Sequence, residues 1–427
     1  MAATVIDSVR IVDGTGAPPI ADGRVVIDAG RIIAAGPKAT IKLPGGADLV
    51  DGSGKTLLPG LVDVHVHDPS DANMALYLRC GVTAIRFAGG AQRSLLDLRS
   101  RIERGETPGP RVFSCGHMLD ATPHAWPGAY AIDTPIEARR VVRRAVLEEK
   151  VDAILATHRV SPATLAAVVE AAHELDVPVT GQIWTSNARD AATSGMDGLE
   201  NTSRIPEHPS FGPERLFARH SVSGRLATLA HLWDAAEPAR LAEIAHLLAE
   251  RQVALAPELV SFEAWGRFAE ADTRSDPEWP APADPRLPLH ERHVSYIASE
   301  WTPDDFAAQQ RAFDKYRSFC ADYVRGGGPL VTGSDLSFGG IYIHREIGHF
   351  VAAGISPLQA IRAATRAAAS ALGRDDLGQI TPGRTADLIV VDGDPTADIR
   401  ALRTVERTMI SGRTVWLRTG NRATAAA

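Results

Sequence analysis

The chain has 427 residues, of which 44% are hydrophobic and 23% charged, so it is long enough for one large domain and a smaller one. Its net charge of -7 and the lack of a dense basic cluster argue against nucleic acid as the main partner. No stretch approaches the ~20 apolar residues of a membrane span, and the strand-like start lacks the pattern of a secretion signal, so we predict no membrane partner.

The three cysteines, Cys80, Cys115 and Cys320, are far apart in the sequence and match no zinc-binding spacing. Any disulfide pairing would leave one of them over. A reduced, cytoplasmic setting is therefore predicted.

The pattern of residues 1–56 predicts short strands separated by Gly, Pro and Asp turns. From residue 58 the pattern becomes strand then helix, repeated, with Ser161 as the N-cap of one predicted helix. The predicted strands of this region are LVDVHVH (61–67), TAIRFAG (83–89), RVFSCG (111–116), DAILATH (152–158), PVTGQI (178–183), DGLEN (197–201), VALAPELV (253–260) and PLVTGSD (329–335).

Eight strands with intervening helices predict an α/β fold, a (β/α)8 TIM barrel whose site lies at the C-terminal strand ends. Residues 377–418 return to strands. The predicted organisation is a small β-sandwich domain built from both chain ends (1–57 and 376–418), a catalytic barrel (58–375) and a frayed tail (419–427). The two long segments 117–134 and 261–302 interrupt the barrel pattern; such loops are usually lids or substrate walls, and whether 261–302 acts as a lid stays open.

His65 and His67 end the first barrel strand. Side chains alternate along a strand with a period of two, so both imidazoles point the same way and can hold one metal ion. Two buried histidines with no metal would give the same pattern. The pair alone does not decide.

Motifs along nearly the whole chain resemble those of the amidohydrolase superfamily, especially its imidazolonepropionase-like and prolidase-like branch. The matching stretches are LLPGLVDVHVH (57–67), GVTAIRFAGG (81–90), VTGSD (331–335), SPLQAIRAATRAAASALG (356–373) and LGQITPGRTADLIVVDGDP (377–395). The resemblance implies a metal-assisted hydrolase of amide, lactone or cyclic amidine bonds. It also implies a site for one or two divalent ions.

The metal ligands implied by the resemblance are only partly present, so the metal site is degenerate. His65 and His67 match the H-x-H of strand 1, and Asp335 matches the aspartate of strand 8. The other three positions carry different residues: Leu155 for the carboxylated lysine of strand 4, Gln182 for the histidine of strand 5 and Asn201 for the histidine of strand 6.

No other lysine can replace the missing one. The predicted barrel contains only Lys150, which precedes strand 4, and Lys315, which lies in a helical stretch. A bridged pair of metal ions is therefore not expected, and no cofactor is the leading prediction. The alternative is one Zn²⁺ or other divalent ion held by His65, His67 and Asp335.

Further candidate residues lie at or near the strand ends. Asp335, with His65 and His67, is a candidate acid or base. Burial should raise the pKa of Asp335 and a protonated histidine beside it should lower that pKa, so we expect a value near the working pH. Glu258 is a second candidate acid, or forms a surface salt bridge. His158 is a candidate proton shuttle near neutral pH, or caps a helix.

A second group of candidates consists of substrate-binding residues. Gln182 and Asn201 are suited to hydrogen-bond an organic ligand. Arg86 is a candidate to bind a substrate carboxylate. The alternative, a structural ion pair, is the favoured interpretation. The remaining candidates for the pocket wall are His117, His124, Trp126 and Trp184.

Three functions remain open. The first is a metal-independent enzyme that uses acid–base catalysis on a small organic substrate, either hydrolysing a lactone or amide or carrying out a cyclisation, rearrangement or elimination. The second is a mononuclear zinc hydrolase of an amide or cyclic amide that uses His65, His67 and Asp335. The third is an inactive small-molecule-binding protein, and in each case a homo-oligomer is possible.

Overall fold

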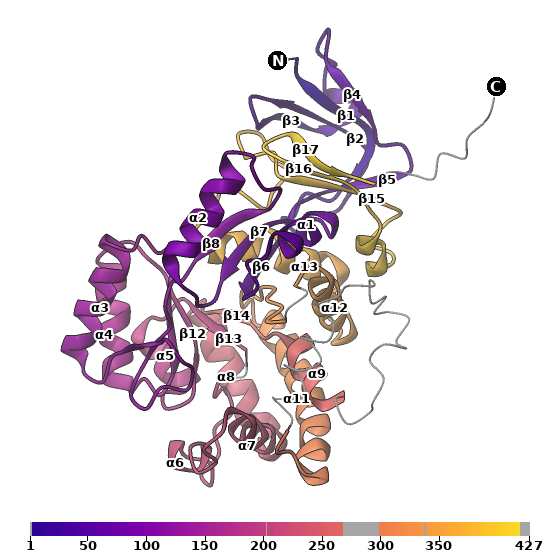
Figure 1. The fold of residues 1–427 in the computed structure, drawn as a ribbon. Helices are drawn as coiled ribbons and strands as arrows, with labels where there is room; N and C mark the ends of the chain where they lie inside the picture. Colours follow the sequence, from indigo (N-terminus) through magenta and orange to yellow (C-terminus); the bar gives the residue numbers. More distant parts are fainter. Residues whose placement is uncertain (1, 202, 268–298, 337–338, 419–427) are drawn as a thin grey trace.

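The computed structural model describes the chain except for residues 1, 202, 268–298, 337–338 and 419–427. Figure 1 shows a β-sheet unit at the top, built from both ends of the sequence, above a larger unit of parallel strands and helices. Among the described residues, none of the helices combines the length and apolar character needed to cross a membrane.

Strands from both ends of the chain share one sheet. Its order is β17-β16-β15-β5-β1-β2-β3, and β4 pairs with β1. The junction between the two ends is antiparallel, with Leu388 opposite Pro59. The strands are β1 (Thr4–Ile11), β2 (Ile20–Asp28), β3 (Arg31–Pro37), β4 (Asp48–Asp51), β5 (Lys55–Pro59), β15 (Leu388–Asp392), β16 (Val405–Ile410) and β17 (Arg413–Leu417).

Alternating apolar side chains of these strands form a core of their own. Ile6, Val25 and Leu57 from the N-terminal strands pack with Leu388 and Met409 from the C-terminal strands. Burial of these side chains from both ends holds the unit together. The predicted sharing of one sheet by the two termini is confirmed.

Eight extended segments of the larger unit run parallel and form the barrel. They are β6 (Leu61–Val66), β7 (Val82–Phe87), β8 (Arg111–Ser114), β11 (Ile154–His158), β12 (Val179–Ile183), β13 (Gly198–Glu200), β14 (Ala254–Ala256) and the segment 329–335. Between β8 and β11 lie the short strands β9 (Leu119–Asp120) and β10 (Tyr130–Ala131), which belong to the predicted long segment 117–134.

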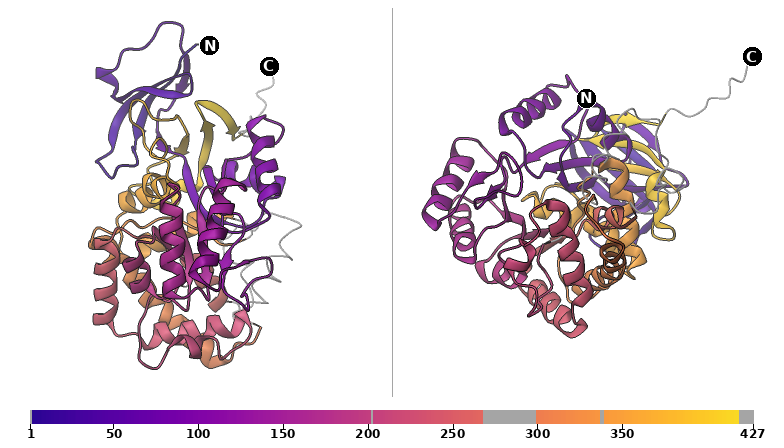
Figure 2. Two further views of the ribbon diagram at one scale, coloured as in Figure 1. Left: turned by 90° about the vertical axis from the view of Figure 1, so that its left-hand side faces the viewer. Right: turned by 60° about the horizontal axis from the view of Figure 1, so that its bottom comes forward.

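Helices surround these strands (Figure 2). Ser161 caps its helix as predicted, since its hydroxyl accepts a hydrogen bond of 3.2 Å from the amide of Thr164. The helices are α1 (Asp71–Arg79), α2 (Gln92–Glu103), α3 (Pro135–Leu147), α4 (Pro162–His173), α5 (Ala188–Ser194), α6 (Pro213–Leu216), α7 (Val222–Ala235), α8 (Pro238–Glu250), α9 (Leu259–Arg267), α11 (Pro303–Arg325), α12 (Gly339–Ala352), α13 (Pro357–Arg362) and α14 (Ala368–Ala371), with shorter turns at Lys38–Thr40, Ala363–Ala367 and Ile399–Arg403.

Two predicted strands differ in the structure. The strand predicted over 253–260 ends at Ala256, because Glu258 has a positive φ of 51° that an extended strand cannot continue through, and α9 begins at Leu259. The segment 329–335 forms only an isolated bridge at Leu330. The long segment predicted over 261–302 includes most of α9, and its part 268–298 lies outside the described residues.

The segment 329–335 nevertheless closes the barrel. The amide of Val331 donates to the carbonyl of Leu255 at 2.9 Å on one side, and the amide of Val64 donates to the carbonyl of Thr332 at 3.0 Å on the other. The last and first strands are thereby joined. The carboxyl ends of all eight segments meet at one face, where the candidate site lies.

Candidate active site

A cavity of about 560 Å³ opens at the carboxyl ends of the barrel strands. This volume suits a small molecule. The six residues predicted to cluster there all line it: His65, His67, Leu155, Gln182, Asn201 and Asp335. The predicted meeting of these positions, which are far apart in the sequence, is confirmed.

Contacts between the first and last strands place Asp335 beside His65. Asp63, two residues before His65 on β6, accepts hydrogen bonds from the hydroxyl of Ser334 at 2.6 Å and from its amide at 3.1 Å. The amide of Asp335 then donates to the carbonyl of His65 at 2.9 Å. The two strand ends are fixed in one register by these bonds.

Three donor and acceptor atoms converge on the cavity floor. The Nε2 atoms of His65 and His67 lie 3.1 Å apart, and Oδ1 of Asp335 lies 3.3 Å from the first and 2.9 Å from the second. His65 is buried, whereas the side chain of His67 is 39% exposed. His67 is therefore the histidine of this pair that is open to the cavity.

The second oxygen of Asp335 is also bonded. Oδ2 accepts from Nδ2 of Asn201 at 2.5 Å and from the hydroxyl of Ser261 at 3.4 Å. Asn201, Glu258 and Asp335 all have φ between 51° and 53°, a left-handed conformation that L-residues rarely adopt. Such strained residues cluster at functional sites, where the surrounding structure holds them.

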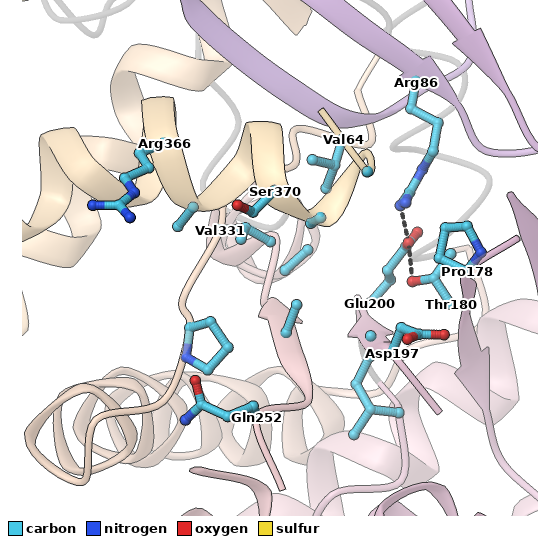
Figure 3. Close-up of a pocket in the computed structure, with 18 of the residues that line it drawn as sticks. Val64, Arg86, Pro178, Thr180, Asp197, Glu200, Gln252, Val331, Arg366 and Ser370 are labelled. Carbon is cyan, nitrogen blue, oxygen red and sulfur yellow. Dashed lines mark hydrogen bonds and ion pairs between the residues drawn. The ribbon is translucent and has the colours of Figure 1, made fainter. Parts of the chain in front are cut away.

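Two buried glutamates lie beneath His65. Its Nδ1 is 2.6 Å from Oε2 of Glu200 and 2.9 Å from Oε1 of Glu258. The other oxygen of Glu200 accepts hydrogen bonds from Arg86 and from the hydroxyl of Thr180, the chain of contacts drawn in Figure 3. Glu200 thus links a buried guanidinium to the histidine of the cavity floor.

The two glutamates differ in charge. Burial raises the pKa of Glu258 to about 8, against the lowering effect of His65, so Glu258 is largely protonated at neutral pH. Burial also disfavours the ionised form of Glu200, but Arg86 and His65 outweigh it and lower the pKa to about 2. Glu258 was predicted as a second acid or a surface salt bridge; it is fully buried, so the surface salt bridge is wrong.

His65 and Asp335 stabilise each other's charged form. Burial disfavours the imidazolium of His65, yet the ionised carboxylates of Asp335 and Glu200, which hydrogen-bond to the ring, raise its pKa well above the usual value. Burial likewise opposes ionisation of Asp335, but the charges and hydrogen bonds of His65 and His67 hold its pKa well below the usual range. The expectation that the pKa of Asp335 lies near the working pH is therefore wrong, because the histidine contacts outweigh desolvation.

His158 forms part of the cavity wall with Gln182 on β12 and Trp184 directly after it. Its Nε2 lies 3.2 Å from Oε1 of Gln182, and its ring packs on Trp184 at 3.9 Å between centroids. Burial, with the nearby charge of Arg225, lowers the pKa of His158 to about 3. His158 is consequently neutral near pH 7, which argues against the predicted proton shuttle.

Two predicted substrate-binding residues do not line this cavity. Arg86 is buried against Glu200 and borders a second cavity of about 700 Å³, at the amino-terminal ends of the strands, where Pro178, Asp197 and Gln252 also lie (Figure 3). Arg86 forms an ion pair with Glu200, which confirms the favoured interpretation of a structural role. His124 lies near the carboxylate of Asp120. His117 and Trp126 line the first cavity, at the carboxyl ends of the strands (the mouth cavity), as predicted.

Sequence reasoning missed Glu200, which contacts both Arg86 and His65. Its signal was present, since the predicted strand DGLEN (197–201) places an acidic residue directly after Leu199, inside the barrel pattern. A buried acidic residue requires a partner. Which partner it has depends on segments far away in the sequence.

The residues present do not fit a bridged pair of metal ions. Leu155 lines the cavity where the resemblance implies a carboxylated lysine, and amides occupy the two other ligand positions. A single ion does fit: His65, His67 and Asp335 offer donor atoms within 4.8 Å of one another. Two imidazoles and a carboxylate are suitable ligands for zinc, and the Nδ1 contact of His65 with Glu200 would orient that ligand.

Comparison with known proteins agrees with this architecture. Residues 317–415 match the amidohydrolase family. A Xaa-Pro dipeptidase with bound methionine has a TM-score of 0.72 at 19% identity, over 97% of this chain and 99% of that one. The ochratoxinase of A. niger has a TM-score of 0.70 at 17% identity, over 97% and 95% of the two chains. Residues 317–415 are thus similar to the amidohydrolase family, and the whole chain shares the fold of these two solved structures.

Curated relatives match a shorter part. An adenine deaminase of Methylobacterium sp. (strain 4-46) is 30% identical over 169 residues, 39% of this chain and 28% of that protein. The adenine deaminase of Methylobacterium nodulans is 30% identical over 186 residues, 42% and 31% of the two. The match thus spans less than a third of either deaminase.

The family match includes part of the candidate site. Its residues 317–415 contain Asp335 and the C-terminal strands β15 and β16, together with the helices between them. His65 and His67 lie outside it. The sequence similarity therefore covers the C-terminal part of the chain, and the similarity of the whole chain is one of fold.

Proposed function

We propose that this protein is an amidohydrolase-superfamily enzyme that hydrolyses an amide, lactone or related bond of a small molecule by acid–base catalysis. The observation that supports the proposal is the group formed by His65, His67 and Asp335 on the floor of a small-molecule cavity. A protein that only binds a ligand has no need of an ion pair and a cavity-facing imidazole in this arrangement.

His67 is the proposed proton acceptor. Asp335 is ionised and its Oδ1 lies 2.9 Å from Nε2 of His67, so the Nε2–H group donates a hydrogen bond to the carboxylate and the other ring nitrogen stays available as a base. Asp335 thereby orients the ring and stabilises the imidazolium that forms, as the carboxylate does in a catalytic triad. The water proton goes to His67 while the water oxygen bonds to the carbonyl carbon.

The neighbouring residues complete the proposed reaction. The proton on His67 passes to the leaving nitrogen or oxygen as the scissile bond breaks, which balances the hydrolysis. Gln182 orients the substrate carbonyl. His65, charged and held by Glu200, offsets the negative charge of Asp335 and adds positive potential beneath the reacting carbonyl. A cyclisation, rearrangement or elimination would use the same proton transfers.

A second candidate is a hydrolase with a single divalent ion. The observation that favours it is the approach of two Nε2 atoms to 3.1 Å, both facing Oδ1 of Asp335. A divalent ion held by His65, His67 and Asp335 would lower the pKa of a bound water. The chain would still bind the substrate through Gln182, and the cavity wall would exclude bulk water.

Metal analysis of protein purified without added metal separates the candidates. The protein is assayed against a panel of neutral amides, lactams and lactones, before and after chelation. Turnover that survives chelation in protein with little bound metal supports the acid–base enzyme. Turnover lost on chelation and restored by zinc supports the single-ion hydrolase, and ligand binding without any turnover would support the inactive binding protein.

A further inference from the structure

The wall of the mouth cavity is apolar and rich in aromatic side chains. Trp126 comes from the segment between β9 and β10, Trp184 follows β12, and Trp265 lies on α9. Met118, Val222 and Leu226 complete the apolar part of the wall. Surfaces of this composition bind flat rings by burial and stacking.

Among the described residues that line the cavity there is no lysine and no arginine. The arginines nearby face other partners. The guanidinium carbon of Arg225 lies 5.7 Å from the ring centre of Trp184, and Arg225 is itself buried. Arg159 lies over the ring of Phe217 at 3.9 Å. A substrate carboxylate bound at this wall would lose its hydration without gaining a lysine or arginine partner from the described lining residues.

The start of α7 offers no substitute for a cation. Val222, its first residue, lines the cavity, and a helix start attracts anions through its free amides. However, the N-cap hydroxyl of Ser221 already meets the carboxylate of Glu300 at 2.5 Å. A second carboxylate arriving there would face a like charge.

The polar groups of the wall suit a neutral ligand. Gln182 and His158 contact each other at 3.2 Å, and both line the cavity. An amide and an imidazole can donate to or accept from a ligand amide or ester. The only carboxylate among the described residues that line the cavity is Asp335.

On the basis of the proposed function, we infer that the substrate is a neutral amide, lactam or ester that carries an aromatic ring, and that molecules with a free carboxylate, such as dipeptides, are excluded. The ring lies against the tryptophans and the scissile carbonyl faces His67. The specificity is set by the aromatic surface and by the lack of lysine and arginine among the described residues that line the cavity.

The test compares two probes that differ in charge. N-acetyl-L-phenylalaninamide and N-acetyl-L-phenylalanine share one ring and one acetyl group, and only the second is an anion at neutral pH. We expect calorimetry on the full chain to show the amide binding about tenfold tighter or more, because the anion leaves a buried charge unpaired. Leu226→Arg should remove or reverse the preference, and Leu226→Met should retain it.

Equal or tighter binding of the anion by the unaltered chain would overturn the inference. Failure of both probes to bind would overturn it as well. Binding of the amide with no hydrolysis of any compound in the panel would refute the proposed function and leave the inferred ligand class standing. The comparison in the unaltered chain does not depend on whether Leu226→Arg folds.

Discussion

Glu200 and His65 are joined by a hydrogen bond of 2.6 Å between Oε2 and Nδ1, although 135 residues separate them in the sequence. The same imidazole contacts Glu258 at 2.9 Å. The two glutamates therefore share one partner, but only Glu200 also has a guanidinium beside it. Their different environments lead to different predicted responses to the same substitution.

Glu200→Gln should destabilise the fold by about 3–5 kcal/mol, because it leaves Arg86 as a buried charge without its ionised partner. Glu258→Gln should cost about 1 kcal/mol or less, because the carboxyl it replaces is already largely protonated and its pKa is raised to about 8. Urea unfolding of both variants at neutral pH measures the difference. Equal losses of stability would show that the two carboxyls carry the same charge.

Asp335→Asn should lower the turnover number by on the order of 10²–10⁴-fold while the fold is retained, because an amide cannot stabilise the charged His67 that forms in the reaction. The rate is measured on a substrate found with the panel of neutral compounds. Asp22→Asn, at an exposed position of β2, is the matched control. Turnover that persists in Asp335→Asn would contradict the proposed mechanism.

The ligand positions suggest a gain of metal binding. A variant with Leu155→Lys, Gln182→His and Asn201→His, prepared in bicarbonate with zinc, should bind about two ions per chain, because all three positions line the cavity beside His65, His67 and Asp335. The variant with only the two histidines lacks the bridging group and is expected to bind fewer. Elemental analysis measures the zinc content of the variants. An unchanged zinc content would contradict the convergence of these positions on one cavity.

Acid should weaken the fold through His344. Its Nε2 bonds to the carbonyl of Cys80 at 2.9 Å, and burial, with the charge of Arg403, lowers its pKa from 6.5 to about 4. The folded pKa is depressed, so the stabilisation is complete above pH 6.5 and is lost as the pH falls toward 4. The loss is roughly 3 kcal/mol, since one pKa unit corresponds to about 1.4 kcal/mol.

His344→Gln keeps a donor for the carbonyl of Cys80 but does not titrate, so its stability should depend less on pH over this range. His246→Gln, an exposed substitution on α8, is the control and should follow the unaltered chain. Urea unfolding of the three proteins between pH 6.5 and 4 measures the slopes. Parallel slopes for His344→Gln and the unaltered chain would rule out this residue as the source.

The order of the elements and most of the cavity floor were predictable from the sequence. Strand and helix periodicities are local, so the alternation that forms the barrel can be read along the chain. His65, His67 and Asp335 lie at or just after the carboxyl ends of predicted barrel strands, and parallel strands place these ends at one face. The resemblance of the motifs identified the positions of Leu155, Gln182 and Asn201 beside them.

Only the tertiary structure decided the charges. Burial and partners that are distant in sequence make Glu258 protonated, Glu200 ionised and His158 neutral, and they move the pKa of Asp335 away from neutrality. Sequence pattern carries residue type and spacing, but a pKa depends on desolvation and on charges within a few ångströms. Those distances exist only once segments 135 residues apart have packed together.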